Sequence, residues 1–512
     1  MDSNPAEAHQ PPRDGALSDP PTMNFTFDNT YARLPARFFA SVSPTSVLAP
    51  RLVKVNRELA GDLGLDPDEL ASPEGVQVLA GNAVPAGAAP IALAYAGHQF
   101  GSFVSQLGDG RAILLGEVVV KDARRFDIQL KGCGRTPFSR RGDGRAALGP
   151  VLREYIVSEA MAKLGVPTTR ALAAVATGEQ VVREEMLPGA VLTRVASSHI
   201  RVGTFQFFAA RADREALITL ASYTLRRHYP DAAGSGNDAL ALLERVVEAQ
   251  ANLVARWLGV GFVHGVMNTD NTAVSGETID YGPCAFLDEY DPNKTFSSID
   301  HDGRYAFANQ PRIALWNLAR FGEALLPLLA DDEDVAARLA TERLQRFSAL
   351  FAAAHERVLR AKLGLAREEE GDPALAADLL ARMASNDVDY TILFRSLCAA
   401  AEDPGEDVRV ASLFAEPGAF HDWSQAWRIR LGREVLAPDV RAAAMRLANP
   451  AFVPRNHRIA QAIEAAVRRD DFAPFETLVQ VLGRPYEDQP EFVHLAEPPQ
   501  PEERVLQTFC GT

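Results

Sequence analysis

The chain has 512 residues, 47% hydrophobic and 23% charged, which is typical of a globular protein with one large or several smaller cores. Its formal net charge of −15 disfavours non-specific binding to nucleic acid or to an anionic membrane, and no apolar run approaches the roughly 18 residues of a membrane-spanning helix. Four cysteines without CxxC spacing argue against a disulfide scaffold or a zinc site. We therefore expect a cytoplasmic protein with no nucleic-acid or membrane partner.

The N-terminal region divides into two parts. Residues 1–23 are rich in Pro, Asp and Ala and lack the basic start and apolar run of a secretory signal, so we expect a disordered leader. Residues 24–99 are expected to form a segment that packs on the core, with helical spacing at 52–63 and 76–80. His98 is expected to be a buried hydrogen-bonding residue rather than a ligand.

A glycine-rich turn, Gly108-Asp109-Gly110-Arg111, lies between strand-like runs at 103–107 and 112–120. A strand, glycine turn and strand let backbone amides approach the phosphates of a nucleotide, where a side chain would clash. The same residues equally form a plain hairpin turn. The turn therefore indicates a nucleotide site only in combination with the residues that come after it in the chain.

Lys131 ends a third strand-like run, 126–131, and Glu154 lies near the start of a helical pattern at 152–164. A glycine turn, a lysine on the next strand and a glutamate on the next helix is the order found in protein kinases, where the ion pair places the ammonium on ATP phosphates. Lys131 could also be a surface lysine, and Glu154 a first-turn acid favoured by the helix dipole. The order along the chain favours the kinase-like pair.

Segment 131–153 is a glycine-rich basic island with a single acid, Asp143. In an acidic protein such an island suggests a specific anion site, although a solvated loop balanced by neighbouring acids fits the charge equally well. Farther on, Arg194 and Arg201 suit bidentate phosphate contacts or pairing with structural acids. The basic residues of the island are Lys131, Arg135, Arg140, Arg141, Arg145 and Arg153.

The central motif is His-Gly-Val-Met-Asn-Thr-Asp-Asn, which ends in Asp270 and Asn271 and is followed by Asp280-Tyr-Gly. Between its halves we predict two short strands, 272–274 and 278–280, joined by a glycine-containing turn. Such a hairpin would bring the three side chains together, and carboxylate and amide oxygens of this kind hold a divalent cation and orient an attacking hydroxyl. Asn-Thr-Asp-Asn is also a common turn composition.

The context of this motif matches the catalytic segment of protein kinases. An amphipathic helix pattern at 239–258 precedes the His-containing loop, and Asp-x-Gly follows it. Val266 stands where a protein kinase has the Asp of His-Arg-Asp, so the usual base is missing from its place. Asp270 is the nearest substitute.

We expect an α+β protein with a bilobal protein-kinase-like fold, an additional N-terminal segment and a helical C-terminal extension. The nucleotide-binding catalytic core is placed at 100–329, the extension at 330–485, and a Pro/Glu-rich tail that carries Cys510 at 486–512. Further helical patterns lie at 214–228, 313–329, 335–363, 374–383, 390–401, 424–431, 440–447 and 457–469.

The motifs Ala-Gly-His-Gln-Phe-Gly, Leu-Gly-Asp-Gly-Arg, Gln-Leu-Lys-Gly-x-Gly-Arg-Thr-Pro-Phe-Ser-Arg-Arg-Gly-Asp-Gly-Arg and His-Gly-Val-Met-Asn-Thr-Asp-Asn with Ile-Asp-Tyr-Gly-Pro resemble those of the selenoprotein O family. The match is collinear over nearly the whole chain after residue 23. The resemblance implies a kinase-like fold, in a family once taken for pseudokinases, and transfer of AMP from ATP to protein hydroxyls. It also implies that ATP is flipped relative to a kinase, so that the α-phosphate faces the acceptor.

Residue by residue, the resemblance implies a nucleotide and metal site. Asp270 would be the base, Glu154 would orient Lys131, and Mg²⁺ or Mn²⁺ would be bound by Asn271 and Asp280. UTP is not excluded as an alternative donor. The nucleotide would be held by Gly108, Gly110, Arg111, Lys131, Asp143, Gly144, Arg194, Arg201 and Asp280.

Cys510 stands where eukaryotic members of that family carry selenocysteine, so the resemblance leaves a redox role open. A single terminal cysteine with no neighbour in sequence is, on its own, more often inert. If the tail folds back to reach Cys284 or Cys398, we expect any disulfide to be reversible and regulatory.

Three classes of function compete. A nucleotidyltransferase that acts on Ser, Thr or Tyr hydroxyls of proteins ranks first, a metal-dependent kinase that uses Asp270 as base ranks second, and a non-catalytic nucleotide-binding scaffold ranks third. A missing metal ligand or strand lysine would favour the scaffold, and neither is missing.

Overall fold

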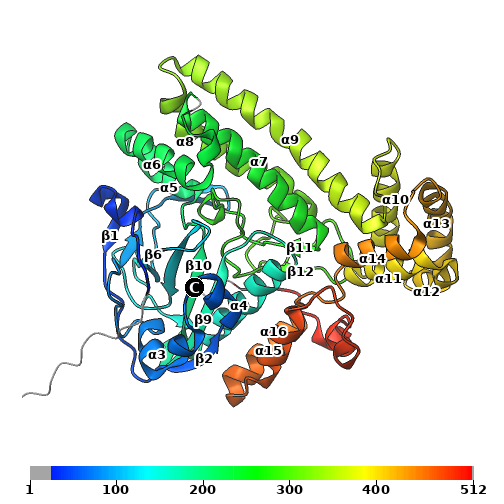
Figure 1. Ribbon diagram of the computed structural model, residues 1–512, viewed down its shortest axis with the longest axis horizontal. Coiled ribbons are helices and arrows are strands. Elements are labelled where there is room, and N and C mark those ends of the chain that lie inside the picture. Colours follow the sequence, from blue (N-terminus) through cyan, green and yellow to red (C-terminus); the bar gives the residue numbers. More distant parts are fainter. Residues whose placement is uncertain (1–24, 235, 510–512) are drawn as a thin grey trace, which may run out of the picture.

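The computed structural model describes residues 25–234 and 236–509, so the expected leader at 1–23 and Cys510 lie outside the described residues. An antiparallel eight-stranded sheet lies on one side of the molecule and helices fill the rest (Figure 1). Its order is β1-β3-β6-β7-β10-β9-β2, with β8 paired to β10. The strands are β1 Phe39–Ser41, β2 Arg51–Val55, β3 Ile91–Leu93, β6 Ala112–Val119, β7 Arg125–Lys131, β8 Ala146–Ala147, β9 Arg170–Val182 and β10 Met186–Ala196.

The N-terminal segment supplies β1, β2 and β3 to this sheet, and β1 and β2 form its two edges. The helix predicted at 52–63 is wrong in its first half, because Arg51–Val55 pairs with β9 as β2. Asn56 then caps α1 Arg57–Asp62 by accepting a hydrogen bond from the backbone N–H of Leu59. Two further helices follow, α2 Pro67–Ala71 and α3 Pro73–Leu79.

The predicted strand at 103–107 does not pair with the strand after the glycine turn. Instead β5 Ser102–Val104 pairs with β4 Gly97–Gln99 in a separate hairpin. Phe100 and Gly101, at its turn, have φ values of 50° and 87°, and two consecutive positive φ values match the twist of a two-residue hairpin. The segment from Gly108 to Arg111 therefore connects this hairpin to the main sheet, where β6 pairs with β3 and β7.

Helix α4, Leu148–Lys163, packs on β9 and β10. It begins four residues before the predicted start at 152. Its first turns are buried on nearly every side, including Leu148, Gly149 and Val151. A helix buried all round has no polar face, and so its start carries no helical periodicity in the sequence.

The helical lobe is built around α7, α8 and α9, which pack on one another (Figure 1). Asn237 caps α7 by accepting a hydrogen bond from the N–H of Leu240. Helix α5 packs on α8 and was not predicted from the sequence. The helices are α5 Val202–Ala209, α6 Arg214–His228, α7 Asp238–Gly259, α8 Gln310–Leu329 and α9 Glu333–Leu363.

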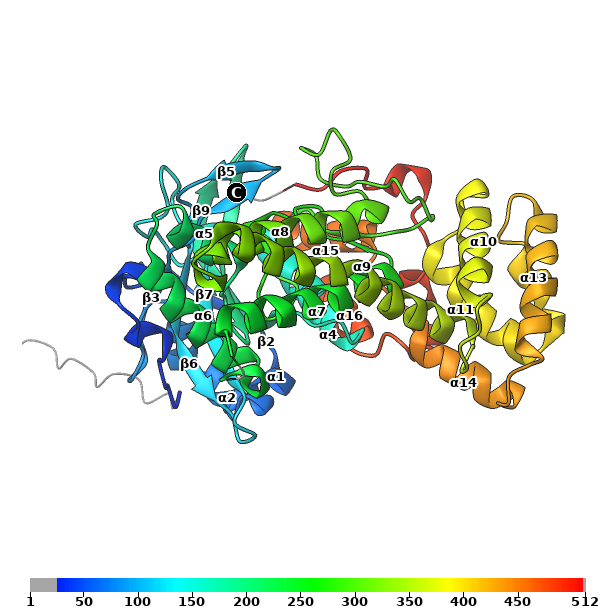
Figure 2. The same ribbon diagram turned by 90° about the horizontal axis from the view of Figure 1, so that it is seen from above.

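The C-terminal helices form two groups. The first lies at the far end of the molecule, as Figure 2 shows, while α15 and α16 return to pack on α4. No helix among the described residues is both long and apolar enough to cross a bilayer. The first group is α10 Asp372–Ser385, α11 Tyr390–Glu402, α12 Asp407–Ala411, α13 Pro417–Leu431 and α14 Pro438–Ala448, and the second is α15 Asn456–Arg469 and α16 Ala473–Leu482.

The expected α+β class and helical C-terminal region are confirmed. Three apolar clusters account for the packing. One unites α4 with the helices α7 and α8, one fills the opposite face of the sheet against α1 and α3, and one lies within the C-terminal helices. The sheet and the helical lobe meet along the loops that carry the predicted site.

Candidate active site

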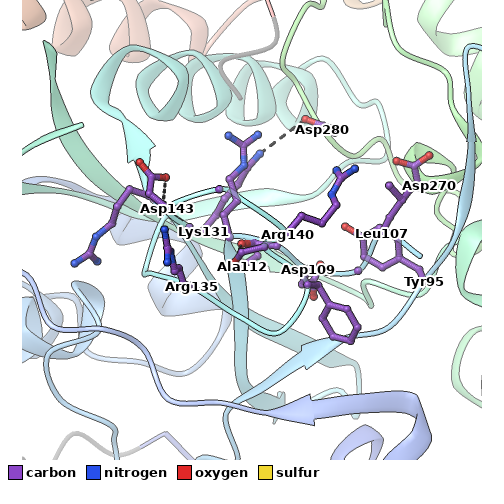
Figure 3. Close-up of a pocket in the computed structure, with 18 of the residues that line it drawn as sticks. Tyr95, Leu107, Asp109, Ala112, Lys131, Arg135, Arg140, Asp143, Asp270 and Asp280 are labelled. Carbon is purple, nitrogen blue, oxygen red and sulfur yellow. Dashed lines mark hydrogen bonds and ion pairs between the residues drawn. The ribbon is translucent and has the colours of Figure 1, made fainter. Parts of the chain in front are cut away.

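A cavity of about 960 Å³ opens between the sheet and the loop after α7. Its volume suits a ligand of nucleotide size. Figure 3 shows Lys131 and Arg140 between Asp143 on one side and Asp270 and Asp280 on the other. Nine basic side chains line it, Arg111, Lys131, Arg135, Arg140, Arg141, Arg145, Arg183, Arg194 and Arg201, against four carboxylates, Asp109, Asp143, Asp270 and Asp280.

Lys131 and Glu154 form an ion pair of 2.5 Å between Nζ and Oε2. Arg194 reaches the other oxygen of Glu154 at 3.2 Å. Burial alone would raise the pKa of Glu154, but the positive charges of Lys131 and Arg194 outweigh burial and lower it. The glutamate is therefore ionised, and it holds the lysine ammonium at the cavity wall.

Asp280 lies 3.8 Å from the Lys131 ammonium, so strand β7 and the Asp-Tyr-Gly segment meet at one point. Burial opposes ionisation of Asp280, yet Lys131, Arg111 and Arg194 lower its pKa to about 2. Its φ of 68° is rare for a residue with a side chain. Such a conformation persists only where the surrounding structure imposes it, and it is common at functional sites.

The hairpin predicted at 272–280 is wrong. The turn exists, since the N–H of Gly276 donates to Ala273, but its arms pair with different segments. Ala273 bridges to Arg201, and Thr278 bridges to Thr168. A pattern of two short apolar runs specifies extended backbone and not its partner. The cluster is formed all the same, because Asp270, Asn271 and Asp280 all line the cavity.

Asp270 lies on the 3-10 turn Thr269–Asn271 and is buried. Its Oδ2 accepts a weak hydrogen bond from Gln99 at 3.3 Å, whereas its Oδ1 has no partner among the described residues. Burial raises the pKa of Asp270 to about 6. A carboxylate that lines the cavity and has a pKa just below neutral is suited to accept a proton.

The Asp270 pKa predicts a pH profile. Below about pH 6 the carboxylate becomes protonated, so kcat/KM should fall about tenfold per pH unit if Asp270 accepts a proton in the reaction. Above it the rate should be flat, because Asp280, with a pKa of about 2, stays ionised throughout. Initial rates from pH 5 to 8, with nucleotide affinity measured at each pH, test this. A flat profile would contradict the assignment.

Gly97 brings hairpin β4–β5 against this aspartate. A Cβ at Gly97 would lie 2.4 Å from Oδ1 of Asp270. Gly97→Ala should therefore displace the hairpin or the Asp270 carboxylate, and if Asp270 acts in the reaction, a displacement of about 1 Å lowers the rate roughly 10²-fold. Gly418→Ala is the matched control, since nothing lies within 4 Å of its added Cβ. Reaction rates and melting temperatures of both variants test this prediction. Equal rates would show that the contact between Gly97 and Asp270 does not constrain the reaction.

Asn271 and Asp280 offer an amide and a carboxylate oxygen. The Asn271 amide nitrogen donates to the carbonyl of Val266 at 3.1 Å, which leaves its oxygen as an acceptor. No cluster of three or more His, Cys, Asp or Glu suited to a metal occurs within residues 25–234 and 236–509. Two hard oxygen ligands nevertheless fit Mg²⁺, which is commonly held by few protein groups together with substrate phosphates and water.

The basic loop is braced by Asp143. Its carboxylate accepts hydrogen bonds from Arg183 at 2.9 and 3.2 Å and from the N–H of Arg145 at 2.9 Å. Gly144 has a φ of 71°, and a Cβ there would lie 2.1 Å from the Gly134 carbonyl oxygen. Asp143 and Gly144 thus set the shape of the loop.

Two basic residues depart from the sequence expectation. Arg183 lines the cavity and was missed, because it lies in the β9–β10 connection without a motif around it. Arg153, counted in the basic island, does not line the cavity and donates instead to the Cys284 carbonyl at 3.3 Å.

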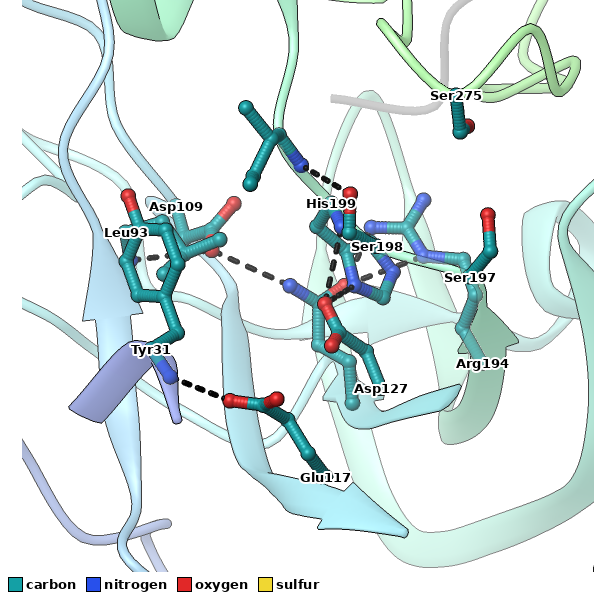
Figure 4. A network of polar contacts seen from close by, with 12 residues as sticks. Tyr31, Leu93, Asp109, Glu117, Asp127, Arg194, Ser197, Ser198, His199 and Ser275 are labelled. Carbon is teal, nitrogen blue, oxygen red and sulfur yellow. Dashed lines mark hydrogen bonds and ion pairs between the residues drawn. The ribbon is translucent and has the colours of Figure 1, made fainter. Parts of the chain in front are cut away.

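Arg201 contacts the backbone of Asp270 directly. Its Nη1 donates to the Asp270 carbonyl at 2.9 Å, its Nε donates to the His199 carbonyl, and its guanidinium lies 4.4 Å over the Tyr95 ring. Figure 4 shows the polar network around Asp127 and His199. Asp127 accepts hydrogen bonds from the backbone and ring nitrogens of His199, both at 2.9 Å.

No cysteine among the described residues lines the cavity. Cys284 and Cys398 are free and buried, and burial raises the pKa of the Cys284 thiol to about 12. The tail approaches this region, since the Thr508 hydroxyl donates to the Pro283 carbonyl at 2.5 Å. The disulfide expected for Cys510 involves a residue beyond those described.

Comparisons with known proteins agree over nearly the whole chain. Residues 21–483 match the sequence model of a family described as "Protein adenylyltransferase SelO". Proteins named "Protein nucleotidyltransferase YdiU" from Methylorubrum populi and a Bradyrhizobium species are each 64% identical, over 497 and 491 residues, covering 96% of this chain and 100% of theirs. The chain therefore belongs to the SelO family of protein adenylyltransferases.

Proposed function

We propose that this enzyme transfers AMP from ATP to Ser, Thr or Tyr hydroxyls of proteins and releases pyrophosphate. Family membership supports nucleotide transfer to protein. The observation that carries the orientation of the nucleotide is the excess of cationic groups in the cavity, nine against four carboxylates. These groups bind the β- and γ-phosphates as a leaving group, which leaves the α-phosphate toward Asp270.

The chemistry balances on residues of this chain. The acceptor oxygen forms a bond to the α-phosphorus, and the bond from that phosphorus to the oxygen bridging the β-phosphate breaks. The hydroxyl proton passes to the carboxylate of Asp270, which lines the cavity. The electron pair leaves with pyrophosphate, whose developing charge is stabilised by Lys131 and the arginines. Glu154 and Arg194 keep the lysine in place.

Asn271 and Asp280 would hold the divalent metal, Mg²⁺ or Mn²⁺, through oxygen ligands. When bound, such an ion neutralises phosphate charge and orients the triphosphate. ATP is the proposed donor. UTP would also be accepted if the protein makes few specific contacts with the nucleobase. Lys131, Arg111 and Arg194 together keep Asp280 in the ionised form that a metal requires.

Mass analysis of products tests the proposal. The purified protein is incubated with ATP, with Mg²⁺ or Mn²⁺, and with casein as a general source of acceptor hydroxyls. We expect adducts with the mass of an AMP group on the enzyme or on casein, together with one pyrophosphate per adduct. Adducts with the mass of a phosphate group, accompanied by ADP, would support the kinase alternative, and no adduct with either metal would support a scaffold.

A further inference from the structure

The β4–β5 hairpin links the base to a second surface. Side chains alternate along a strand, and Gln99 reaches Asp270 while its neighbour His98 turns away. The His98 ring contacts Gln206 and meets the Trp316 ring edge-on, with centroids 5.2 Å apart. One face of the hairpin therefore belongs to the nucleotide cavity, and the other contributes to a surface on α8. Figure 2 places β5 at the rim of the molecule.

This surface, which we call the α8 patch, consists of Arg304, Arg312, Trp316 and Arg320. The guanidinium of Arg304 lies 4.7 Å over the Trp316 ring, and that of Arg320 lies 5.1 Å over it. Arg312 is exposed and precedes Trp316 by four residues, which places both on the same face of α8. Phe103, 43% exposed, continues the patch through its contact with His98.

The positive charge of the α8 patch is poorly compensated. Nε and Nη2 of Arg304 are buried and have no hydrogen-bond partner in the described chain. The adjacent acid Asp300 uses its two oxygens on the backbone N–H groups of Arg304 and Tyr305. Arg320 pairs with Glu323, yet its Nε also has no partner among the described residues. These nitrogens are buried, so an incoming carboxylate would meet the accessible side of the patch, where Arg312 is exposed, and would be attracted by its net positive charge.

The hairpin also sets the distance of the patch from the base. Gly97 touches Asp270 at one end, and at the turn a Cβ on Gly101 would lie 3.7 Å from the Arg304 guanidinium. From Gly97 to the turn at Phe100 the strand advances three residues, or about 10 Å. An extended segment laid along the hairpin with its hydroxyl at Asp270 therefore places a residue three or four positions away beside Arg304.

We propose that the α8 patch binds acceptor proteins through acidic residues that lie three or four positions from the modified hydroxyl. The inference rests on the proposed transfer to protein hydroxyls and adds the class of acceptor. Charge complementarity favours this occupant, because a cationic patch on a protein of net charge −15 attracts acidic segments selectively. Trp316 adds a flat apolar platform for the segment.

A peptide library tests the inference. Peptides with a central Ser, Thr or Tyr and random residues at four positions on each side are incubated with enzyme, ATP and metal, and the AMP-bearing products are sequenced. We expect enrichment of Asp and Glu three or four positions from the hydroxyl on one side. No enrichment, enrichment of Lys and Arg, or no labelled peptide from an enzyme that labels itself would overturn it. An enzyme that labels neither itself nor peptide contradicts the proposed function instead.

Variants assign the effect to the patch. With one Asp-bearing peptide and its Asn counterpart, the wild type should show a roughly tenfold lower KM for the former, with similar kcat. Arg304→Gln and Arg312→Gln should each reduce this preference, and Arg304→Lys should restore part of it. Arg338→Gln, which removes an exposed arginine of α9, is the matched control. Arg312 is exposed, so Arg312→Gln should fold normally. It therefore still tests the proposal if Arg304→Gln misfolds. Unchanged preference in both Gln variants would overturn the proposal.

Discussion

Asp270→Asn is expected to lose nearly all transfer while still binding ATP. If Asp270 takes the acceptor proton, its amide cannot, and loss of a general base costs roughly 10²–10⁴-fold in rate. The fold should not suffer. Burial raises the pKa of Asp270, so the charged form is disfavoured in the folded state, and a neutral amide of the same size removes that cost.

This variant should therefore lose its transfer rate without losing stability. We expect the melting temperature at pH 7.5 to be equal to that of the wild type or higher, and calorimetric ATP affinity to be similar. Single-turnover transfer then reports the chemical step alone. A variant that is destabilised and loses ATP binding along with transfer would show that Asp270 is structural, and one that keeps its rate would show that another group accepts the proton.

Asp280→Ala is expected to abolish both metal binding and transfer. The carboxylate is one of two proposed metal ligands. The negative charge of the triphosphate would be neutralised by that ion as well as by Lys131, which lies beside Asp280. Losing both positioning and charge stabilisation should lower the rate by more than about 10³-fold. In this variant the Lys131 ammonium still pairs with Glu154, 2.5 Å away, so the sheet and helix α4 should remain folded.

Binding of Mn²⁺ in the presence of ATP, followed by electron paramagnetic resonance, measures the metal directly. Asp122→Ala is the matched control, because Asp122 is an acid in an exposed turn far along the sheet from the cavity. Its Mn²⁺ affinity and rate should equal those of the wild type. Full Mn²⁺ affinity in Asp280→Ala would remove Asp280 from the metal site.

Much of the helical lobe is predictable from the sequence. The pattern at 214–228 coincides with α6 Arg214–His228, and those of α7, α8 and α9 begin within a few residues of the observed starts. These helices have one apolar and one polar face, so their periodicity is visible. Helix α5 Val202–Ala209 is short and almost wholly buried, and it has no such periodicity.

The sheet and the site depend on pairings that the sequence does not specify. The strand at 103–107 has a strand pattern, but only the turn at Phe100 and Gly101 decides that it pairs with β4. The motif residues Lys131, Glu154 and Asp280 meet as their order in the chain suggested. Arg183 reaches the cavity through tertiary contacts alone, and no local signal marks it. Gln99 lies in the Ala-Gly-His-Gln-Phe-Gly motif, but its contact with Asp270 depends on tertiary structure.

The most direct test of the proposed transfer uses two isotopic labels of ATP in parallel. The enzyme is incubated with a metal ion and with ATP labelled on either the α- or the γ-phosphate, and labelled protein is separated from nucleotide. We expect protein to acquire label only from the α-phosphate, while the γ-label appears in pyrophosphate, because the cationic loop and Arg194 hold the leaving group. Protein labelled from the γ-phosphate would contradict this mechanism and show that the enzyme is a kinase.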